Sequence, residues 1–178
     1  MINVKSGRPG ENPRAAMARG FTLIELMIAL TILGILIGLV APSFNNAALG
    51  GKLSSFASSL VASTQIARSE AIKRNAVVTV CASEDGTTCG SSGGWEKGWI
   101  VVLADGTVLQ RQQELPSEFR IDEASDIDTL DFPPSVVGAT TAAFTVCRAT
   151  PVGKQNRVVT VTASGSTRVT QNTATSCP

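Results

Sequence analysis

The feature that most constrains this chain is an apolar run near its N-terminus. Residues 21–41 contain one charged side chain, Glu25, and almost every residue from Leu26 to Ala41 is apolar. As an α-helix this segment would extend about 30 Å, which matches the hydrocarbon core of a bilayer. A helix that is apolar on all faces and this long exceeds what a domain of this size can surround. The run therefore predicts a transmembrane helix over residues 21–42 and disfavours a buried core helix.

The twenty residues before the run are polar and basic. They contain four cations against one acid, Glu11, and they show neither helical nor strand periodicity. Positive charge before a span orients the N-terminus toward the cytoplasm, so the bulk of the chain is expected beyond the membrane. We predict that residues 1–20 form a leader peptide. A secretory signal is an alternative, but Pro42 stands where its small-residue cleavage site would have to lie.

The position of Glu25 in the apolar run indicates whether the chain is cleaved before this segment. An ionised carboxylate inside hydrocarbon costs about 2.5–3.5 kcal/mol on insertion scales and is rarely found there without a partner. The nearest candidate partner is the α-amine that would form at Phe21 if the chain were cut after Gly20. The alternative is a permanent anchor that holds Glu25 close to the membrane interface, where a charge is tolerated.

Eight continuous residues carry a resemblance that favours cleavage. Arg19-Gly20-Phe21-Thr22-Leu23-Ile24-Glu25-Leu26 resembles the type IV prepilin processing motif, at which a membrane-embedded prepilin peptidase cuts after Gly and methylates the new N-terminal Phe. The resemblance implies cleavage between Gly20 and Phe21 and methylation of Phe21. It also implies that Glu25 neutralises the N-terminal amine of a neighbouring subunit during assembly. Such a protein is a single-pass inner-membrane protein with a periplasmic C-terminal domain, and it enters a pilus or pseudopilus.

Residues 43–75 are expected to form an amphipathic helix. Their apolar side chains recur at helical spacing on one side only, which is typical of a helix packed on a core. Asn75 is a plausible terminator. The stripe comprises Leu49, Leu53, Phe56, Leu60, Ala67 and Ala71.

From residue 76 onward the apolar period changes to two, which predicts a β-rich globular domain over residues 76–178. Asp105-Gly106 and Ser164-Gly165 have the composition of tight hairpin turns, and Trp95 and Trp99 are expected to cover the edge of the sheet. The fold class is therefore α+β, with a long N-terminal helix packed on an antiparallel β-sheet. The resemblance to prepilins implies that this fold is pilin-like. The predicted strands are 77–81, 98–103, 107–109, 119–121, 143–147, 157–162 and 167–169.

Four cysteines, Cys81, Cys89, Cys147 and Cys177, all lie beyond the apolar run. An even number beyond a membrane signal indicates disulfides in an oxidising compartment, although the sequence allows three pairings. We predict the sequential pairing, Cys81 with Cys89 and Cys147 with Cys177. Four buried, reduced thiols are the alternative. A zinc site is disfavoured because the chain has no His and neither pair has the short spacing of a zinc knuckle.

The sequence offers no reaction centre. Without His, the Ser-His and Cys-His nucleophile arrangements are unavailable, and the Gly-rich residues 90–94 lack the Lys-Ser/Thr of a phosphate loop. The acids between Asp122 and Asp131 lack the Gly and the closing Glu of a calcium loop, so they are interpreted as a solvated loop. We expect neither an enzyme nor a cofactor nor a bound metal.

Two further segments narrow the resemblance. Ala67-Arg68-Ser69-Glu70-Ala71-Ile72-Lys73-Arg74 and Trp95-Glu96-Lys97-Gly98-Trp99-Ile100-Val101-Val102 resemble the GspH/FimT/FimU group of minor pilins and pseudopilins. The resemblance implies a minor pilin near the tip of a type IV pilus, which initiates or supports assembly. Its partners would be the prepilin peptidase, the other minor and major pilins, and the inner membrane. The alternative within the group is the H-type pseudopilin of a type II secretion system.

The last third of the chain is weakly basic, which raises a DNA-binding alternative. Some members of the group bind DNA during natural transformation through a Gly-Arg-x-Arg segment near the C-terminus. Here Gly165-Ser166-Thr167-Arg168 keeps only one of those Arg residues. A weak, salt-sensitive contact with phosphates would have to use the cations of this third. They are Arg148, Lys154, Arg157 and Arg168.

Overall fold

The computed structural model describes residues 20–90, 94–135, 137–149, 155–172 and 177, apart from the side chains of residues 39–46. The predicted leader, residues 1–19 of it at least, and Lys154 lie outside the described residues. The chain divides into two compact units, Met1–Pro42 and Ser43–Pro178. Among the described residues, the first unit contributes the start of the long helix, and the second contains the described strands.

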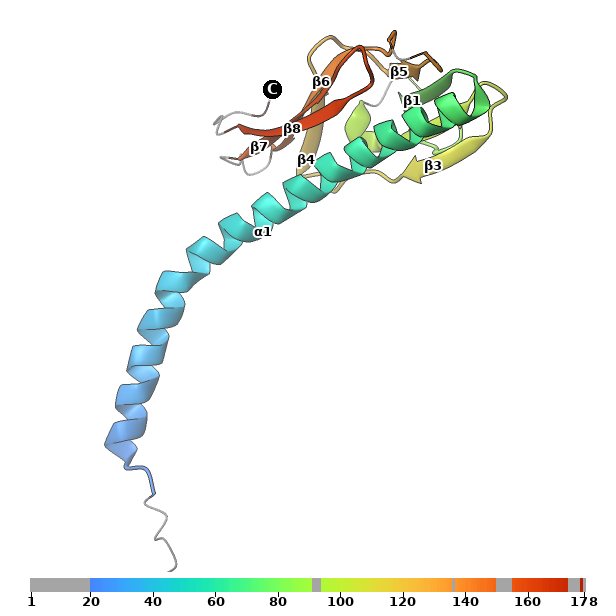
Figure 1. Cartoon of the computed structure of the whole chain (residues 1–178). Helices are drawn as coiled ribbons and strands as arrows, with labels where there is room; N and C mark the ends of the chain where they lie inside the picture. Colours follow the sequence, from blue (N-terminus) through green and yellow to red (C-terminus); the bar gives the residue numbers. More distant parts are fainter. Residues whose placement is uncertain (1–19, 91–93, 136, 150–154, 173–176, 178) are drawn as a thin grey trace, which may run out of the picture. The chain divides into compact units, whose positions relative to one another are not determined.

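Helix α1 spans Leu23–Arg74 and thus includes all but the terminal residues of the two predicted segments, 21–42 and 43–75 (Figure 1). The helix ends as the sequence predicts, because Asn75 adopts a positive φ of 51° and the amide of Ala76 donates to the carbonyl of Ala71. In the last turns, Arg74 Nε lies 2.6 Å from a carboxylate oxygen of Glu70. This i,i+4 pair lies at the surface, with 45% of the Arg74 and 20% of the Glu70 side chain exposed, so its contribution to stability is small.

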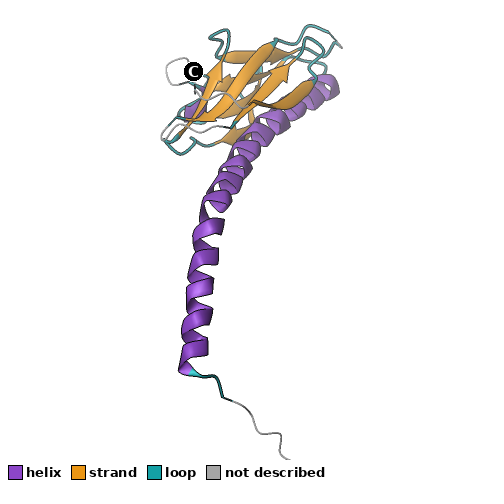
Figure 2. Ribbon diagram, turned by 90° about the vertical axis from the view of Figure 1, so that its left-hand side faces the viewer, coloured by secondary structure: helices purple, strands orange, loops and turns teal. Residues whose placement is uncertain are grey.

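The strands form two antiparallel four-stranded sheets rather than the single sheet that the sequence suggested (Figure 2). The first sheet has the order β3-β2-β1-β5 and the second has the order β4-β6-β7-β8. The strands are β1 Val78–Ala82, β2 Trp99–Leu103, β3 Val108–Gln112, β4 Phe119–Glu123, β5 Thr129–Phe132, β6 Ala142–Arg148, β7 Asn156–Val161 and β8 Thr167–Asn172.

Two elements were missing from the sequence prediction. Strand β5 has only four residues and follows an acidic loop, yet it pairs with β1 from Val78↔Phe132 to Cys81↔Thr129. The short 3-10 helix η1, Trp95–Lys97, precedes β2. Because β4 lies in the second sheet and β5 in the first, the chain crosses between the sheets after Glu123. The α+β class and the antiparallel pairing are nevertheless confirmed.

The core lies between the apolar stripe of α1 and the two sheets. Leu49, Leu53, Leu60, Ala67 and Ala71 are buried, as the helical spacing predicts, and they share one cluster with side chains of both sheets. Such burial of a one-sided stripe is the main source of stability for a helix of this kind.

Both tryptophans are buried in this core, so the prediction that they cover a sheet edge is wrong. Trp99 packs toward α1, where its indole nitrogen donates to Ser63 Oγ. Trp95 lies against Phe144 with the ring centroids 4.8 Å apart, and its indole nitrogen donates to the carbonyl of Ile127. Each indole N–H thus has the partner that a buried Trp requires.

Candidate processing and assembly site

The predicted cleavage junction lies immediately before helix α1. Gly20 and Phe21 are both outside the helix and exposed, with 81% of Phe21 accessible. A Cβ atom on Gly20 would meet nothing within 4 Å, and Gly20 is not among the residues with positive φ. The described chain therefore gives no steric or conformational reason for glycine at this position.

Thr22 caps the helix at its N-terminus. Its hydroxyl accepts a hydrogen bond of 3.3 Å from the amide of Glu25, and its carbonyl accepts one from the amide of Leu26. Thr22-x-x-Glu25 has the spacing of a capping box, a signal that was present in the sequence but not used. The cap begins the helix just after Phe21, so cleavage before Phe21 would leave the first turn intact.

Glu25 lies in the first turn of α1, where a carboxylate interacts favourably with the helix dipole. Its side chain is exposed and is flanked by the exposed apolar side chains of Ile24 and Leu26. Among the residues that the structure describes, none forms an ion pair with this carboxylate. A cationic partner for Glu25 would therefore have to come from outside the described part of the chain.

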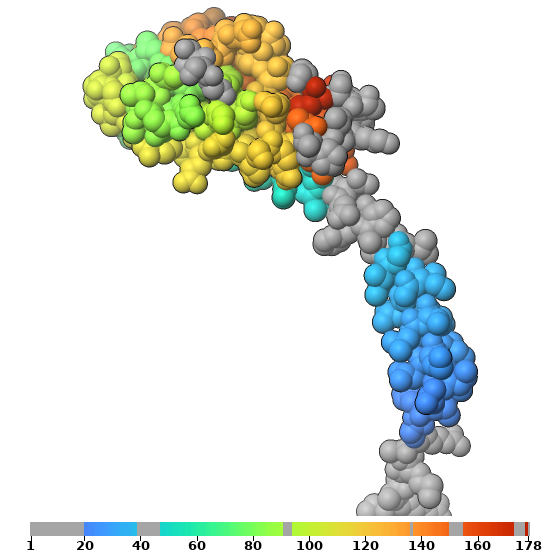
Figure 3. Space-filling model, turned by 180° about the vertical axis from the view of Figure 1, so that it is seen from behind, coloured from blue at the N-terminus to red at the C-terminus, as the bar shows by residue number. Residues whose placement is uncertain are grey.

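The described side chains of the first unit beyond Glu25, from Leu26 to Gly38, present an almost wholly apolar surface. Every residue from Gly20 to Gly38 is exposed, and in Figure 3 this segment forms the blue part of the molecule. Exposed apolar surface of this extent marks contact with lipid or protein. In the part of the chain with described side chains, no helix is both long and apolar enough to cross a bilayer. The exposed large side chains include Leu30, Ile32, Leu33, Ile35, Leu36 and Ile37.

Both disulfides have the predicted sequential pairing. Cys81 in β1 is bonded to Cys89, and Cys147 in β6 is bonded to Cys177, each with a Cα–Cα distance of 5.5 Å. The first bond closes a short loop that Asp85 organises, because its carboxylate accepts hydrogen bonds from the amides of Thr87 and Thr88. These amides, that of Thr88 first, hold the pKa of Asp85 far below its usual range.

The basic side chains proposed for DNA contact do not form one exposed patch among the described residues. Arg148 is half-buried at the end of β6, and Arg157 is half-buried with its Nε donating to Ser54 Oγ of α1 at 3.1 Å. Arg168 is exposed on β8. Arg157 is thus engaged in holding β7 against the helix.

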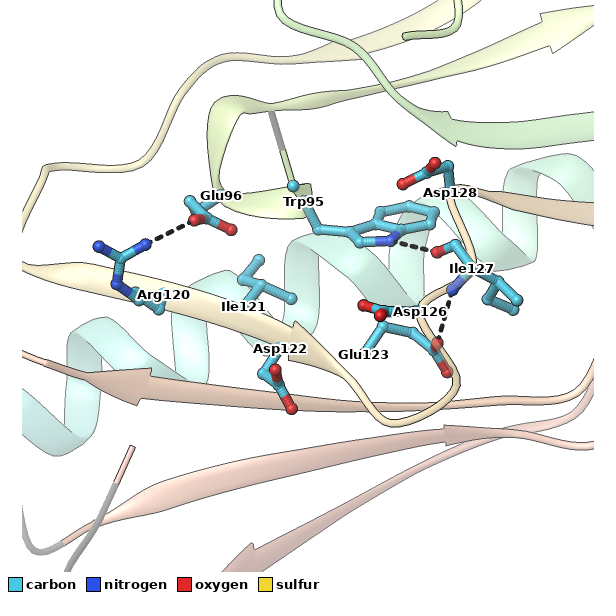
Figure 4. A pocket seen from close by; sticks show the side chains of 10 residues that line it. Trp95, Glu96, Arg120, Ile121, Asp122, Glu123, Asp126, Ile127 and Asp128 are labelled. Atoms are coloured by element: carbon cyan, nitrogen blue, oxygen red, sulfur yellow. Dashed lines mark hydrogen bonds and ion pairs between the residues drawn. The ribbon is translucent and has the colours of Figure 1, made fainter. Parts of the chain in front are cut away.

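The predicted acidic loop lines a pocket of about 340 Å³ beside η1 (Figure 4). The carboxylate of Glu123 is buried and accepts hydrogen bonds from the amides of Ser125, Ile127 and Ala143. Across the pocket, Arg120 Nη1 pairs with Glu96 at 2.9 Å. Glu123 therefore orders its own loop, and the described residues include no group of acidic or Cys side chains arranged to hold a metal ion.

Family comparisons match both parts of the chain. A model of the family described as Type II transport protein GspH matches residues 57–165, and one for the prokaryotic N-terminal methylation motif matches residues 16–41. The second match includes Gly20, Phe21 and Glu25. No curated protein matches the chain.

Two solved proteins have folds similar to that of this chain. The type IV minor pilin FimU of Pseudomonas aeruginosa, solved in two crystal forms, has a TM-score of 0.52 and 25% identity in each. In the first form the match covers 66% of this chain and 92% of FimU. The minor pseudopilin EpsH from the type 2 secretion system of Vibrio cholerae has a TM-score of 0.49 and 15% identity, covering 66% of this chain and 95% of EpsH.

Proposed function

Because the chain belongs to the GspH family of minor pilins and pseudopilins, we propose that it is a minor pilin of a type IV pilus, built into the filament near its tip. There it initiates or supports assembly, and its part is structural rather than catalytic. The observation that carries the proposal is the match to the type IV minor pilin FimU, most of whose length this chain covers.

The N-terminal segment supports a membrane stage before assembly. In our proposal, residues 21–42 span the inner membrane, and the prepilin peptidase removes the leader after Gly20 and methylates Phe21. Lipid covers the exposed apolar side chains between Leu23 and Ile37 at this stage. In the filament, the helices of neighbouring pilins take the place of the lipid.

The charge of Glu25 would favour packing in the filament over the isolated subunit in the membrane. A carboxylate in hydrocarbon is unfavourable without a cation, and Glu25 has no ion-pair partner among the described residues. A neighbouring subunit that presents an N-terminal amine would remove part of this cost. Assembly would then be favoured over the isolated, membrane-bound state.

A second candidate function is that of an H-type pseudopilin in a type II secretion system, which the name of the matching family favours. Both assemblies would use the same processing site and the same helix. The difference between them therefore lies in the partner subunits.

Deletion of the gene in its host tests the proposal against this alternative. We expect surface pili, measured as sheared filament protein, to fall strongly and to return when the intact gene is restored. Release of type II secretion substrates into the medium should stay unchanged. Normal piliation with lost secretion would overturn the pilus assignment in favour of the pseudopilin.

A further inference from the structure

A small notch lies where helix α1 meets the end of the second sheet. It has a volume of about 300 Å³ and is lined by Ala48, Leu49, Lys52, Glu118, Phe119 and Arg148. We call these six residues the helix–sheet notch. A space of this size can accept one side chain from another molecule.

Arg148 lies on the helix-facing side of the sheet. In the β4–β6 pair it stands directly opposite Phe119, so the two side chains share one face. Phe119 is buried and packs edge-on against Phe56 of α1, with the ring centroids 5.0 Å apart. The Arg148 side chain therefore points toward the helix side, where the notch opens.

The guanidinium group of Arg148 has an unmet hydrogen-bond donor. Its Nε atom is buried, and no group among the described residues accepts a hydrogen bond from it. An arginine is always charged, and a buried charged donor without an acceptor is unfavourable. No described residue forms an ion pair with Arg148, so the outer nitrogens of its guanidinium group lack a carboxylate that a second molecule could supply.

The other charged residues of the helix–sheet notch do not neutralise the positive charge of Arg148. Lys52 Nζ lies 3.5 Å from Glu118, with 60% and 42% of their side chains exposed. The same Lys52 nitrogen lies 5.7 Å from the centre of the Phe119 ring. Lys52 and Glu118 largely cancel, so the notch carries one positive charge in excess beside an apolar wall of Leu49 and Phe119.

We propose that the helix–sheet notch binds the carboxylate of an Asp or Glu side chain from a neighbouring pilin subunit, with Arg148 as the main donor. Arginine binds carboxylates through two parallel hydrogen bonds, and the apolar wall suits the aliphatic stem of such a side chain. The notch borders Ala48, an exposed residue of α1. This inference rests on the proposed function, since α1 is the element through which the subunits would pack.

Incorporation of full-length variants into filaments in the host tests this inference. Arg148→Gln should lower the fraction of mature protein in sheared filaments by about tenfold, the loss expected when about one charge-assisted hydrogen bond is removed. Arg148→Lys keeps the charge but loses the planar guanidinium that can form two parallel hydrogen bonds, so it should give an intermediate loss. Lys73→Gln, an exposed cation outside the notch, should behave as wild type.

Thermal unfolding of the detergent-solubilised full chain separates an interface role from an internal one. Because Arg148 Nε has no acceptor within the described chain, Arg148→Gln should leave the unfolding temperature unchanged. A fall of several degrees, or wild-type incorporation of Arg148→Gln, would overturn the inference. Absence of the wild-type protein from filaments would instead contradict the proposed function.

Photo-crosslinking identifies the chemical class of the occupant. With p-benzoylphenylalanine at Ala48, assembled filaments should give a crosslink to a peptide of another pilin that contains Asp or Glu near the crosslinked position. Crosslinks confined to lipid or to the same chain would refute a neighbouring subunit as the occupant.

Discussion

The indole nitrogen of Trp99 donates a hydrogen bond of 2.8 Å to Ser63 Oγ in the buried interface between strand β2 and helix α1. Ser63 is fully buried and in turn donates to the carbonyl of Ser59, one turn earlier in the helix. One hydroxyl therefore satisfies the indole nitrogen of Trp99 and links the helix to the first sheet.

Removing this hydroxyl should destabilise the fold. Ser63→Ala would leave the Trp99 N–H buried without an acceptor, at a cost of about 1–3 kcal/mol in the free energy of unfolding. Ser58→Ala, at an exposed position of the same helix, controls for the higher helix propensity of Ala. Denaturant unfolding followed by Trp fluorescence measures both variants, and equal stabilities would contradict this role of Ser63.

Gly98 should tolerate no side chain. Its φ is +118°, and a Cβ atom there would lie 2.6 Å from the carbonyl oxygen of Gln112 and 3.1 Å from that of Ser83. Backbone strain and crowding together predict a loss of about 3 kcal/mol or more for Gly98→Ala. Gly106→Ala is the matched control, since Gly106 also has a positive φ but nothing within 4 Å of a Cβ atom. Its loss should be about 1 kcal/mol, and equal unfolding midpoints for the two variants would be inconsistent with crowding at Gly98.

The sequence predicted the helix and most strands because their apolar periods are long and regular. The stripe from Leu49 to Ala71 and the hairpin turn at Asp105-Gly106 are local signals, and both are confirmed. The division into two sheets was not predictable, because it depends on which distant strands pair. Strand β5 joins β1 across about fifty residues, and only four residues carry its pattern.

Asp85 should make stability depend on pH. The amides of Thr88 and Thr87 lower its pKa in the folded state, so its stabilisation is complete above the unfolded-state pKa of about 3.9 and declines as pH falls further. The difference in unfolding free energy between wild type and Asp85→Asn should therefore be largest at neutral pH and shrink below about pH 4. Equilibrium unfolding from pH 7 to pH 3 measures it. A constant difference over that range would contradict a charged Asp85 as the organiser of the disulfide loop.

Only part of the candidate site could be predicted from the sequence. Gly20, Phe21 and Glu25 form a contiguous motif, so their positions followed directly from the residue order. The surroundings of the basic residues could not be predicted in the same way. The hydrogen bond from Arg157 to Ser54 and the burial of Arg148 Nε depend on how β6 and β7 pack on α1. The weak positive charge of the last third did not show that Arg148 and Arg157 are half-buried in the folded chain.

Glu25 should act in assembly and not in processing. Glu25→Gln keeps the size of the side chain but removes its charge, so filament incorporation should fall by about tenfold or more while cleavage after Gly20 continues. Glu84→Gln, an exposed acid in the β-rich unit, should leave both unchanged. Immunoblots of membrane and sheared-filament fractions report incorporation, and normal incorporation of Glu25→Gln would remove the reason for pairing it with a neighbour's amine.

Mass spectrometry of the N-terminal peptide from protein isolated from its host tests the central claim most directly. The mature chain should begin at Phe21, carry one methyl group on its α-amine and lack the first twenty residues. A chain that retains Gly20, or that begins at any other residue, would contradict the account of how this protein enters a filament.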